Sequence, residues 1–396
     1  MNPPADPIAA VVHPDPYPYY ADLVAKSPLY RDEKLGMWVA SSAAAVDAVL
    51  NNPHGRVRPP SELVPAAIRG GPAGELFGNL VRQNDGSRHG SIKSVVSMRF
   101  TALDPDTIGR SAQEWANTLA EGASPFTDAG RVDDFARRLP VCVVAGLLGF
   151  HKESALSLVD LTADLVRCYA PGASPERIAK GHDAATAMLA AMRNNPAHAG
   201  HAPLLSLGNQ SRSGGPPEHA LPEDLRLANS VGLLIQAYEA TAGLIGNTLL
   251  VLATHPDWLD RARADPTVTA SIVLEVARYD SPVQNTRRFF GRDVEILGQN
   301  IPGGQVVLAV LAAANRDPSA NPNPDRFDPG RRFRRIYTFG TGIHACPGKV
   351  LALSIAQAGI ARLLASGLDV ERTVTGHGYR HSLNGRIPVF AGTDAA

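Results

Sequence analysis

The sequence predicts a mainly helical protein with a small β region. Residues 222–254 form a long, largely apolar stretch that exceeds the usual length of a strand. Residues 288–307 instead alternate between apolar and polar side chains and contain turn residues, which is typical of short strands. Several other segments are rich in alanine and bounded by Pro, Gly or Asp, so helices outweigh strands in the prediction.

The other elements follow from local signals, taken in chain order. Residues 29–41 alternate around a turn at 32–34, which predicts a strand pair. Ser42 then caps an alanine-rich helix that ends near Asn52. Asp104 and Pro105 suit the N-cap and first position of another helix. Further helices are predicted at residues 89–98, 132–148, 153–168, 175–193, 256–263 and 268–279. Residues 55–85 are expected to be irregular with room for one short helix, and residues 205–222 to form a loop.

Composition and charge argue against several classes of protein. The chain has 396 residues, of which 44% are hydrophobic, and its formal net charge is zero. The chain has no excess of basic residues that would favour nucleic-acid binding. The three cysteines show neither zinc spacing nor a paired framework. No secretory leader is visible, and no uninterrupted apolar run reaches about 18 residues. We therefore expect a soluble, cytoplasmic protein without a membrane anchor.

Residues 339–348, Phe-Gly-Thr-Gly-Ile-His-Ala-Cys-Pro-Gly, are the most informative stretch of the chain. The glycines let the backbone fold tightly around Cys346, so that amide N–H groups can point at its sulfur. An alanine-rich helix follows, and its positive end stabilises a thiolate. A lone cysteine is usually a buried free thiol. The six residue types fixed here instead favour a thiolate ligand for haem iron, which promotes cleavage of the O–O bond.

This stretch resembles the haem-binding loop of the cytochrome P450 family, Phe-Gly-x-Gly-x-His-x-Cys-x-Gly. The resemblance implies a single P450 domain over residues 1–396, with haem b between the long central helix and the cysteine loop. It makes Cys346 the axial ligand of the metal. It also implies that the two haem propionates meet His89, Lys93, Arg288 and His344. The family often has Arg at position 93, and lysine lacks its forked guanidinium.

A second motif, Glu275-x-x-Arg278, places an acid and a base on one helix face. Alone, such a pair is usually an exposed salt bridge that contributes little. The sequence resembles the Glu-x-x-Arg motif of the P450 family, where the pair is buried and joins its helix to the segment before the haem loop. Residues 325–327 are the expected partner segment here. We therefore interpret the pair as structural support for the haem pocket.

The long helix departs from the family pattern Ala-Gly-x-Asp/Glu-Thr, in which the acid and the alcohol organise water for proton delivery. Alignment on the acid keeps Glu239 but puts Ala240 at the alcohol position. Thr241 lies about 100° further around the helix and cannot simply replace the missing hydroxyl. A different register places Ala242 and Gly243 on the Ala-Gly pair but loses both the acid and the alcohol. Glu239 and Thr241 are the catalytic candidates.

A basic cluster flanks the cysteine loop. Such a cluster can be a solvent-exposed face without a specific function. It can also be a docking surface for an acidic electron donor. The chain contains no flavin or iron–sulfur motif, so we expect a monomer that receives electrons from a ferredoxin and its ferredoxin reductase. The cluster consists of Arg331, Arg332, Arg334, Arg335 and Lys349.

The resemblance implies an oxidoreductase that acts on a small secondary metabolite with O₂. Residues 238–243 also look like the actinobacterial enzymes that couple tryptophan-containing cyclic dipeptides, and family members that join aromatic rings often lack the alcohol. Two alternatives stay open: a monooxygenase that hydroxylates or epoxidises a macrolide- or terpene-like compound, and a non-catalytic haem sensor. Substrate contacts are expected from Gln236, Ala237, Ala240, Asn285, Thr286 and Leu383.

Overall fold

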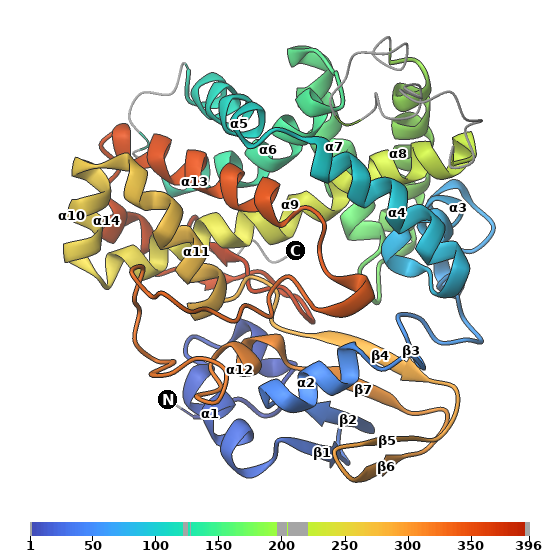
Figure 1. Cartoon of the computed structure of the whole chain (residues 1–396). Coiled ribbons are helices and arrows are strands. Elements are labelled where there is room, and N and C mark those ends of the chain that lie inside the picture. Colours follow the sequence, from blue (N-terminus) through green and yellow to red (C-terminus); the bar gives the residue numbers. More distant parts are fainter. Residues whose placement is uncertain (1, 122–125, 127, 196–203, 205–220, 393–396) are drawn as a thin grey trace.

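Figure 1 shows the computed structural model of the chain, which describes residues 2–121, 126, 128–195, 204 and 221–392. The predicted mainly helical fold with a small β region is confirmed. Most helices gather in one large part, and the main sheet lies below them with α1, α2 and α12 (Figure 1). The loop predicted at residues 205–222 lies outside the described residues, apart from its last two.

The main sheet has five strands in the order β1-β2-β7-β4-β3. The pairs β1–β2, β4–β7 and β3–β4 are antiparallel, whereas β2 and β7 run parallel. The strand pair expected near the N-terminus and the strands expected within residues 288–307 are both confirmed. The bounds are β1 Leu29–Asp32, β2 Met37–Ala40, β3 Gly55–Arg56, β4 Thr286–Phe290, β5 Val294–Ile296, β6 Gln299–Ile301, β7 Val306–Ala309, β8 Gly378–Tyr379 and β9 Pro388–Val389.

Two predicted helix starts, at Ser42 and at Asp104, are confirmed, whereas α4 and α6 begin three residues before their predicted starts and α1, α12 and α14 were not predicted. The Ser42 hydroxyl accepts a hydrogen bond from the Ala45 N–H at 3.2 Å, and the Asp104 carboxylate caps the helix that Pro105 opens. The helices are α1 Tyr17–Lys26, α2 Ala43–Leu50, α3 Pro72–Asn79, α4 Gly86–Ala102, α5 Pro105–Ala120, α6 Ala129–Leu147, α7 Lys152–Cys168, α8 Pro175–Arg193, α9 Glu223–Ala253, α10 Pro256–Ala264, α11 Thr269–Tyr279, α12 Leu311–Asn315, α13 Lys349–Ala365 and α14 Val370–Val374.

Helix α9 forms the centre of the helical part. It packs against α6, α13 and α11, and apolar side chains such as Leu234, Ile245 and Leu249 are fully buried along it. A helix that is apolar over most of its circumference is typical of a protein core. Residues 55–85, predicted as irregular, contain β3, α3 and the short 3₁₀ helices Ala66–Ile68 and Val81–Gln83. The last of these lies against the N-terminal part of α9, because the Val81 N–H donates to the Asn229 side chain at 2.8 Å.

Candidate haem site

The cysteine loop is tightly folded, as the glycine pattern predicted. Gly340 and Gly342 have φ angles of +67° and +69°, a region that L-residues with a side chain rarely adopt. The Gly340 N–H donates to the Tyr337 carbonyl at 2.7 Å, and the Cys346 N–H donates to the Phe339 carbonyl at 2.8 Å. A Cβ atom on Gly342 would also lie 2.6 Å from the Asn51 side-chain oxygen. These contacts fix the backbone on both sides of Cys346.

The sulfur of Cys346 differs from the other two thiols of the chain. Cys142 and Cys168 are buried, whereas solvent reaches Cys346. Desolvation by the surrounding protein nevertheless raises the pKa of the Cys346 thiol, and a hydrogen bond from the Gly348 N–H and the charges of Lys93 and Lys349 oppose this rise. The start of α13 follows directly, and the positive end of this helix would favour a thiolate at Cys346.

Helix α4 brings a histidine to the cysteine loop. The rings of His89 and His344 lie 4.0 Å apart between their centroids, and His89 is 4% exposed. Burial, together with the neighbouring His344 and Lys93, lowers the pKa of His89 to about 4. His344 Nε2 lies 3.3 Å from an Asp85 carboxylate oxygen. The two histidines that the resemblance assigned to the haem propionates are therefore in contact, although they are far apart in the sequence.

Lys93 lies one turn further along α4. Its ammonium donates to the Ala345 carbonyl, next to the cysteine. Burial lowers the pKa of Lys93, and the neighbouring Cys346 opposes this effect. The lysine therefore ties α4 to the cysteine loop, and its charge lies close to the sulfur.

Arg288 approaches the same region from strand β4. It is 5% exposed, and within the described residues its guanidinium has one hydrogen bond, to the Arg287 carbonyl at 2.9 Å, and no carboxylate ion pair. Burial lowers its pKa, while Asp85 acts in the opposite direction. A buried guanidinium normally needs an anionic partner. The residues therefore fit a haem. Cys346 is a thiol that solvent reaches, and an arginine with no ion pair among the described residues, two histidines and a lysine suit its two carboxylates.

The Glu275–Arg278 pair is fully buried, as expected from the motif. Arg278 Nη2 lies 2.7 Å from a Glu275 oxygen, and both side chains are 0% exposed. Arg278 also donates to the carbonyls of Asn315, Pro324 and Arg326. The expected link to the segment before the cysteine loop is thus present, but it uses backbone carbonyls. The Asp325 carboxylate pairs instead with Arg316 at 2.7 Å.

The prediction of an exposed basic cluster is wrong for two of its arginines. Arg331 and Arg334 turn inward and bind Glu275, at 3.3 and 2.7 Å, and their side chains are 9% and 13% exposed. Arg335 pairs with Asp47 at 2.5 Å. The guanidiniums of Arg278, Arg331 and Arg334 therefore surround the buried carboxylate of Glu275. The local sequence could not reveal this arrangement, because Glu275 lies on α11. Of the cluster, Arg332 and Lys349 remain exposed without such an ion pair in the described part of the chain.

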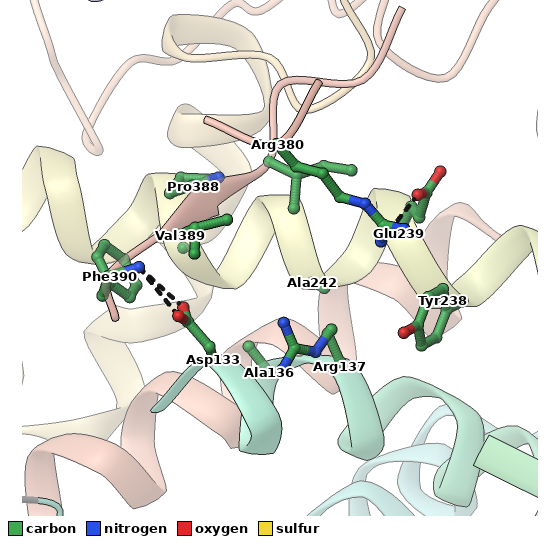
Figure 2. A pocket seen from close by; sticks show the side chains of 12 residues that line it. Asp133, Ala136, Arg137, Tyr238, Glu239, Ala242, Arg380, Pro388, Val389 and Phe390 are labelled. Atoms are coloured by element: carbon green, nitrogen blue, oxygen red, sulfur yellow. Dashed lines mark hydrogen bonds and ion pairs between the residues drawn. The ribbon is translucent and has the colours of Figure 1, made fainter. Parts of the chain in front are cut away.

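On α9, Glu239 forms an ion pair with Arg380, whose Nη1 lies 3.2 Å from Oε1 (Figure 2). Burial raises the pKa of Glu239, and the cations Arg380 and Arg82 oppose this rise. Ala240 is partly exposed, and Thr241 is buried at 2% exposure. The two positions face different directions, as the 100° step requires. Neither Arg82 nor Arg380 was predicted, because each approaches α9 from a segment far away in the sequence.

Figure 2 shows a small pocket beside this ion pair, between α6, α9 and the C-terminal strand. It has room for about one water molecule. None of the cysteine-loop residues lines it. Its polar lining consists of Asp133, Arg137, Tyr238, Glu239 and Arg380.

The glycines of α9 explain why the alternative register is less suitable. A Cβ atom on Gly243 would lie 2.9 Å from the Arg386 carbonyl, and one on Gly246 would lie 3.1 Å from the Pro388 ring. Both glycines thus let the C-terminal segment approach the helix closely. This packing role accounts for Gly243 without an Ala-Gly motif at that position and supports the register based on Glu239.

Some predicted substrate-contact residues lie together. The Asn285 amide donates to the Leu383 carbonyl at 2.9 Å, and Asn285 is 2% exposed. A β-bridge between Val283 and Gly385 continues this pairing. Asn285 therefore positions the segment around Leu383, while Thr286 follows as the first residue of β4. Among the α9 candidates, the Gln236 amide donates to the Gly232 carbonyl at 2.9 Å, and Ala237 and Ala240 are partly exposed.

Comparisons with known proteins agree with this geometry. A family model described as Cytochrome P450 matches residues 205–366. The chain is 30% identical over 367 residues to cytochrome P450 monooxygenase PikC of Streptomyces venezuelae, covering 91% of this chain and 86% of the relative. It is 28% identical over 377 residues to 6-deoxyerythronolide B hydroxylase of Saccharopolyspora erythraea, covering 91% and 92%. The crystal structure of CalO2 matches with a TM-score of 0.80 at 26% identity, covering 98% and 99% of the two chains.

The chain belongs to the cytochrome P450 family. It is therefore a haem b oxidoreductase with the P450 fold. The sensor alternative finds no support among these relatives, which include monooxygenases and hydroxylases. No helix in the described residues is both long and apolar enough to span a membrane.

Proposed function

We propose that this P450 oxidises a small secondary metabolite by oxidative coupling of two tryptophan-containing cyclic dipeptides, with O₂ and with electrons from a ferredoxin and its reductase. The observation that carries this proposal is Ala240 at the alcohol position of α9, beside an acid held by Arg380. Coupling forms one bond between the substrates as each loses one hydrogen. Together with two electrons and two protons from the donor system, these hydrogens reduce O₂ to two waters.

Bound haem supplies the O₂ chemistry, and the protein's residues supply its ligand, its anchors and its protons. Cys346 would supply the thiolate that ligates the haem iron. The propionates would be held by His89, Lys93, Arg288 and His344. These residues lie on α4, on β4 and in the cysteine loop, so a bound haem would connect these three elements.

Glu239 is the proton carrier in this proposal, with Thr241 as a secondary candidate. Burial raises the pKa of Glu239, and the charges of Arg380 and Arg82 oppose this rise. A raised pKa lies closer to the operating pH, at which a catalytic carboxyl can both take up and release a proton. The water-sized pocket beside it connects the carboxyl to Tyr238 and Arg137. Because no alcohol stands at position 240, proton delivery relies on this carboxyl and on water.

A second candidate function is conventional oxygen insertion into a macrolide- or terpene-like compound. The relatives favour it, because one is named as a hydroxylase of 6-deoxyerythronolide B. In this reaction one oxygen atom enters the substrate and the other becomes water. The substrate would meet the Asn285–Leu383 region and the partly exposed face of α9 at Gln236, Ala237 and Ala240.

Product masses separate the two functions. The purified, haem-loaded protein is incubated with cyclo-dipeptides that contain tryptophan, together with a ferredoxin, its reductase and NADPH. Coupling predicts a product of twice the substrate mass less two hydrogens, and a shift of the haem absorption band when substrate binds. A product that gains one oxygen supports the second candidate. No spectral shift with any indole-bearing cyclic dipeptide contradicts the coupling proposal.

A further inference from the structure

Arg99, near the C-terminal end of α4, is a buried charge that has no ion pair among the described residues. Its side chain is 5% exposed, and its Nε atom is shielded from solvent yet has no hydrogen-bond acceptor in the described part of the protein. Charged side chains are rarely buried unless they are paired, because the loss of hydration is costly. The buried Arg278 obeys that rule, since it shares Glu275 with two further arginines.

A second arginine lies beside the first. Arg226, in the first turns of α9, is brought to α4 by an apolar cluster in which Val96 and Phe100 pack with Leu221 and Leu225. The Arg226 Nε atom is also shielded and also lacks an acceptor among the described residues. Burial, followed by repulsion from Arg226, lowers the pKa of Arg99. Two cations close to each other in a partly buried position repel each other, and an anion between them would remove this repulsion.

The acids at the start of α9 do not neutralise this pair. Glu223 lies 3.8 Å from Arg193 on the neighbouring helix α8 and is directed toward it. Asp224 is exposed and has no ion pair to Arg226 in the part of the chain described. The two guanidiniums therefore keep several N–H donors available, and their planar, forked geometry matches the oxygens of a phosphate-type group.

We propose that Arg99 and Arg226 form a binding site for a phosphate-type oxyanion, separate from the haem site. Such an anion would bridge the end of α4 to the start of α9. Arg99 lies six residues after Lys93, roughly 9 Å along the helix axis, so the site would also stabilise the helix that carries His89 and Lys93. The proposal does not depend on which substrate the enzyme oxidises.

The test is thermal unfolding of the full-length, haem-loaded protein in a chloride buffer with and without inorganic phosphate at constant ionic strength. We expect saturating phosphate to raise the Tm of the wild-type protein by about 1–3 °C. Arg226→Gln and Arg99→Gln should lose this increment. Arg110→Gln, which removes an exposed arginine of α5, should retain it and controls for general effects of phosphate on stability.

Three results would overturn the proposal: no phosphate-dependent increase in the wild type, the same increase in Arg226→Gln, or an equal increase with acetate. The last would identify a carboxylate ligand instead of a phosphate-type one. Arg226 is only half-buried, so its variant decides the question even if Arg99→Gln fails to fold. Removing either arginine should also raise the Tm in chloride, since it relieves the repulsion between them.

Discussion

The two walls of the haem site differ in how firmly the protein holds them. On the cysteine side, Glu275 is fully buried and bound by Arg278, Arg331 and Arg334, and hydrogen bonds fix the loop around Cys346. On the α9 side, Glu239 is partly exposed, and within the described residues its one ion pair is with Arg380. The cysteine side follows the family pattern, whereas α9 departs from it at Ala240. We infer that the first wall determines whether haem is held and the second determines which reaction follows.

Removing the central carboxylate of the cysteine side should have the largest effect. Glu275→Gln leaves three arginines around a neutral side chain, and breaking a buried ion pair typically costs about 3–5 kcal/mol of folding free energy. Denaturant unfolding of the haem-loaded protein measures this loss. Glu176→Gln, which breaks an exposed pair with Lys180 at 2.9 Å, is the control and should leave the stability nearly unchanged. A similar small change in Glu275→Gln would contradict the comparison.

The same carboxylate predicts a pH dependence. Burial alone would raise the pKa of Glu275, but hydrogen bonds and charge from Arg278 and Arg334 hold it below its ordinary value. The unfolded chain therefore takes up this proton at a higher pH than the folded protein does. The stabilisation is complete above the unfolded pKa of about 4.3 and is lost as the pH falls through the lowered folded value. Stability curves of wild type and Glu275→Gln should converge in acid, and parallel curves would contradict this.

Removing a propionate partner should have the next largest effect. A hydrogen bond to a charged group contributes about 1.5–3 kcal/mol, so Arg288→Gln should speed haem loss about 10-fold to 100-fold. Transfer of haem to an acceptor protein measures this rate. Arg292→Gln changes an exposed arginine just after β4 and should leave the rate unaltered. If both variants lose haem at the wild-type rate, Arg288 is not a propionate partner.

The residues of the cysteine side and of the α9 side also show what the sequence can predict. The cysteine loop, the helix caps and the Glu275–Arg278 pair depend on residues close together in the chain, and they were placed correctly. The inward turn of Arg331 and Arg334 could not be predicted, because their acid lies on α11. The Asp85–His344 and Glu239–Arg380 contacts were missed for the same reason, since each joins segments that meet only after folding.

On the α9 side, changes should affect turnover more than folding. Glu239→Gln should slow product formation about 10-fold to 100-fold if its carboxyl delivers protons. Arg380→Gln should act in the same direction but less strongly, because it removes a charge that opposes the raised pKa of Glu239. The pH profile of turnover should therefore shift to higher pH in Arg380→Gln. Arg372→Gln changes an exposed arginine of α14 and is the control. An unshifted pH profile in Arg380→Gln would exclude the proposed influence of Arg380 on proton delivery by Glu239.

The smallest effect is expected from restoring the alcohol. Ala240→Thr places a hydroxyl where the family usually has one, and position 240 is partly exposed, so the larger side chain can be accommodated. We expect the share of oxygen-inserted product to rise a few-fold, at the expense of coupled product, without a change in stability. Ala237→Thr puts the same group one turn earlier and should not do so. Equal product ratios in both variants would show that the missing alcohol does not direct the reaction.

The most direct test of the account is the carbon monoxide difference spectrum of the reduced, haem-loaded protein. Ligation by the Cys346 thiolate predicts the absorption peak specific to thiolate-bound haem in the wild type, and its loss in Cys346→Ala. Cys142→Ala, which alters a buried thiol of α6, should keep the peak. A folded, haem-loaded wild type without this peak, or a Cys346→Ala variant that retains it, would contradict the assignment of the ligand.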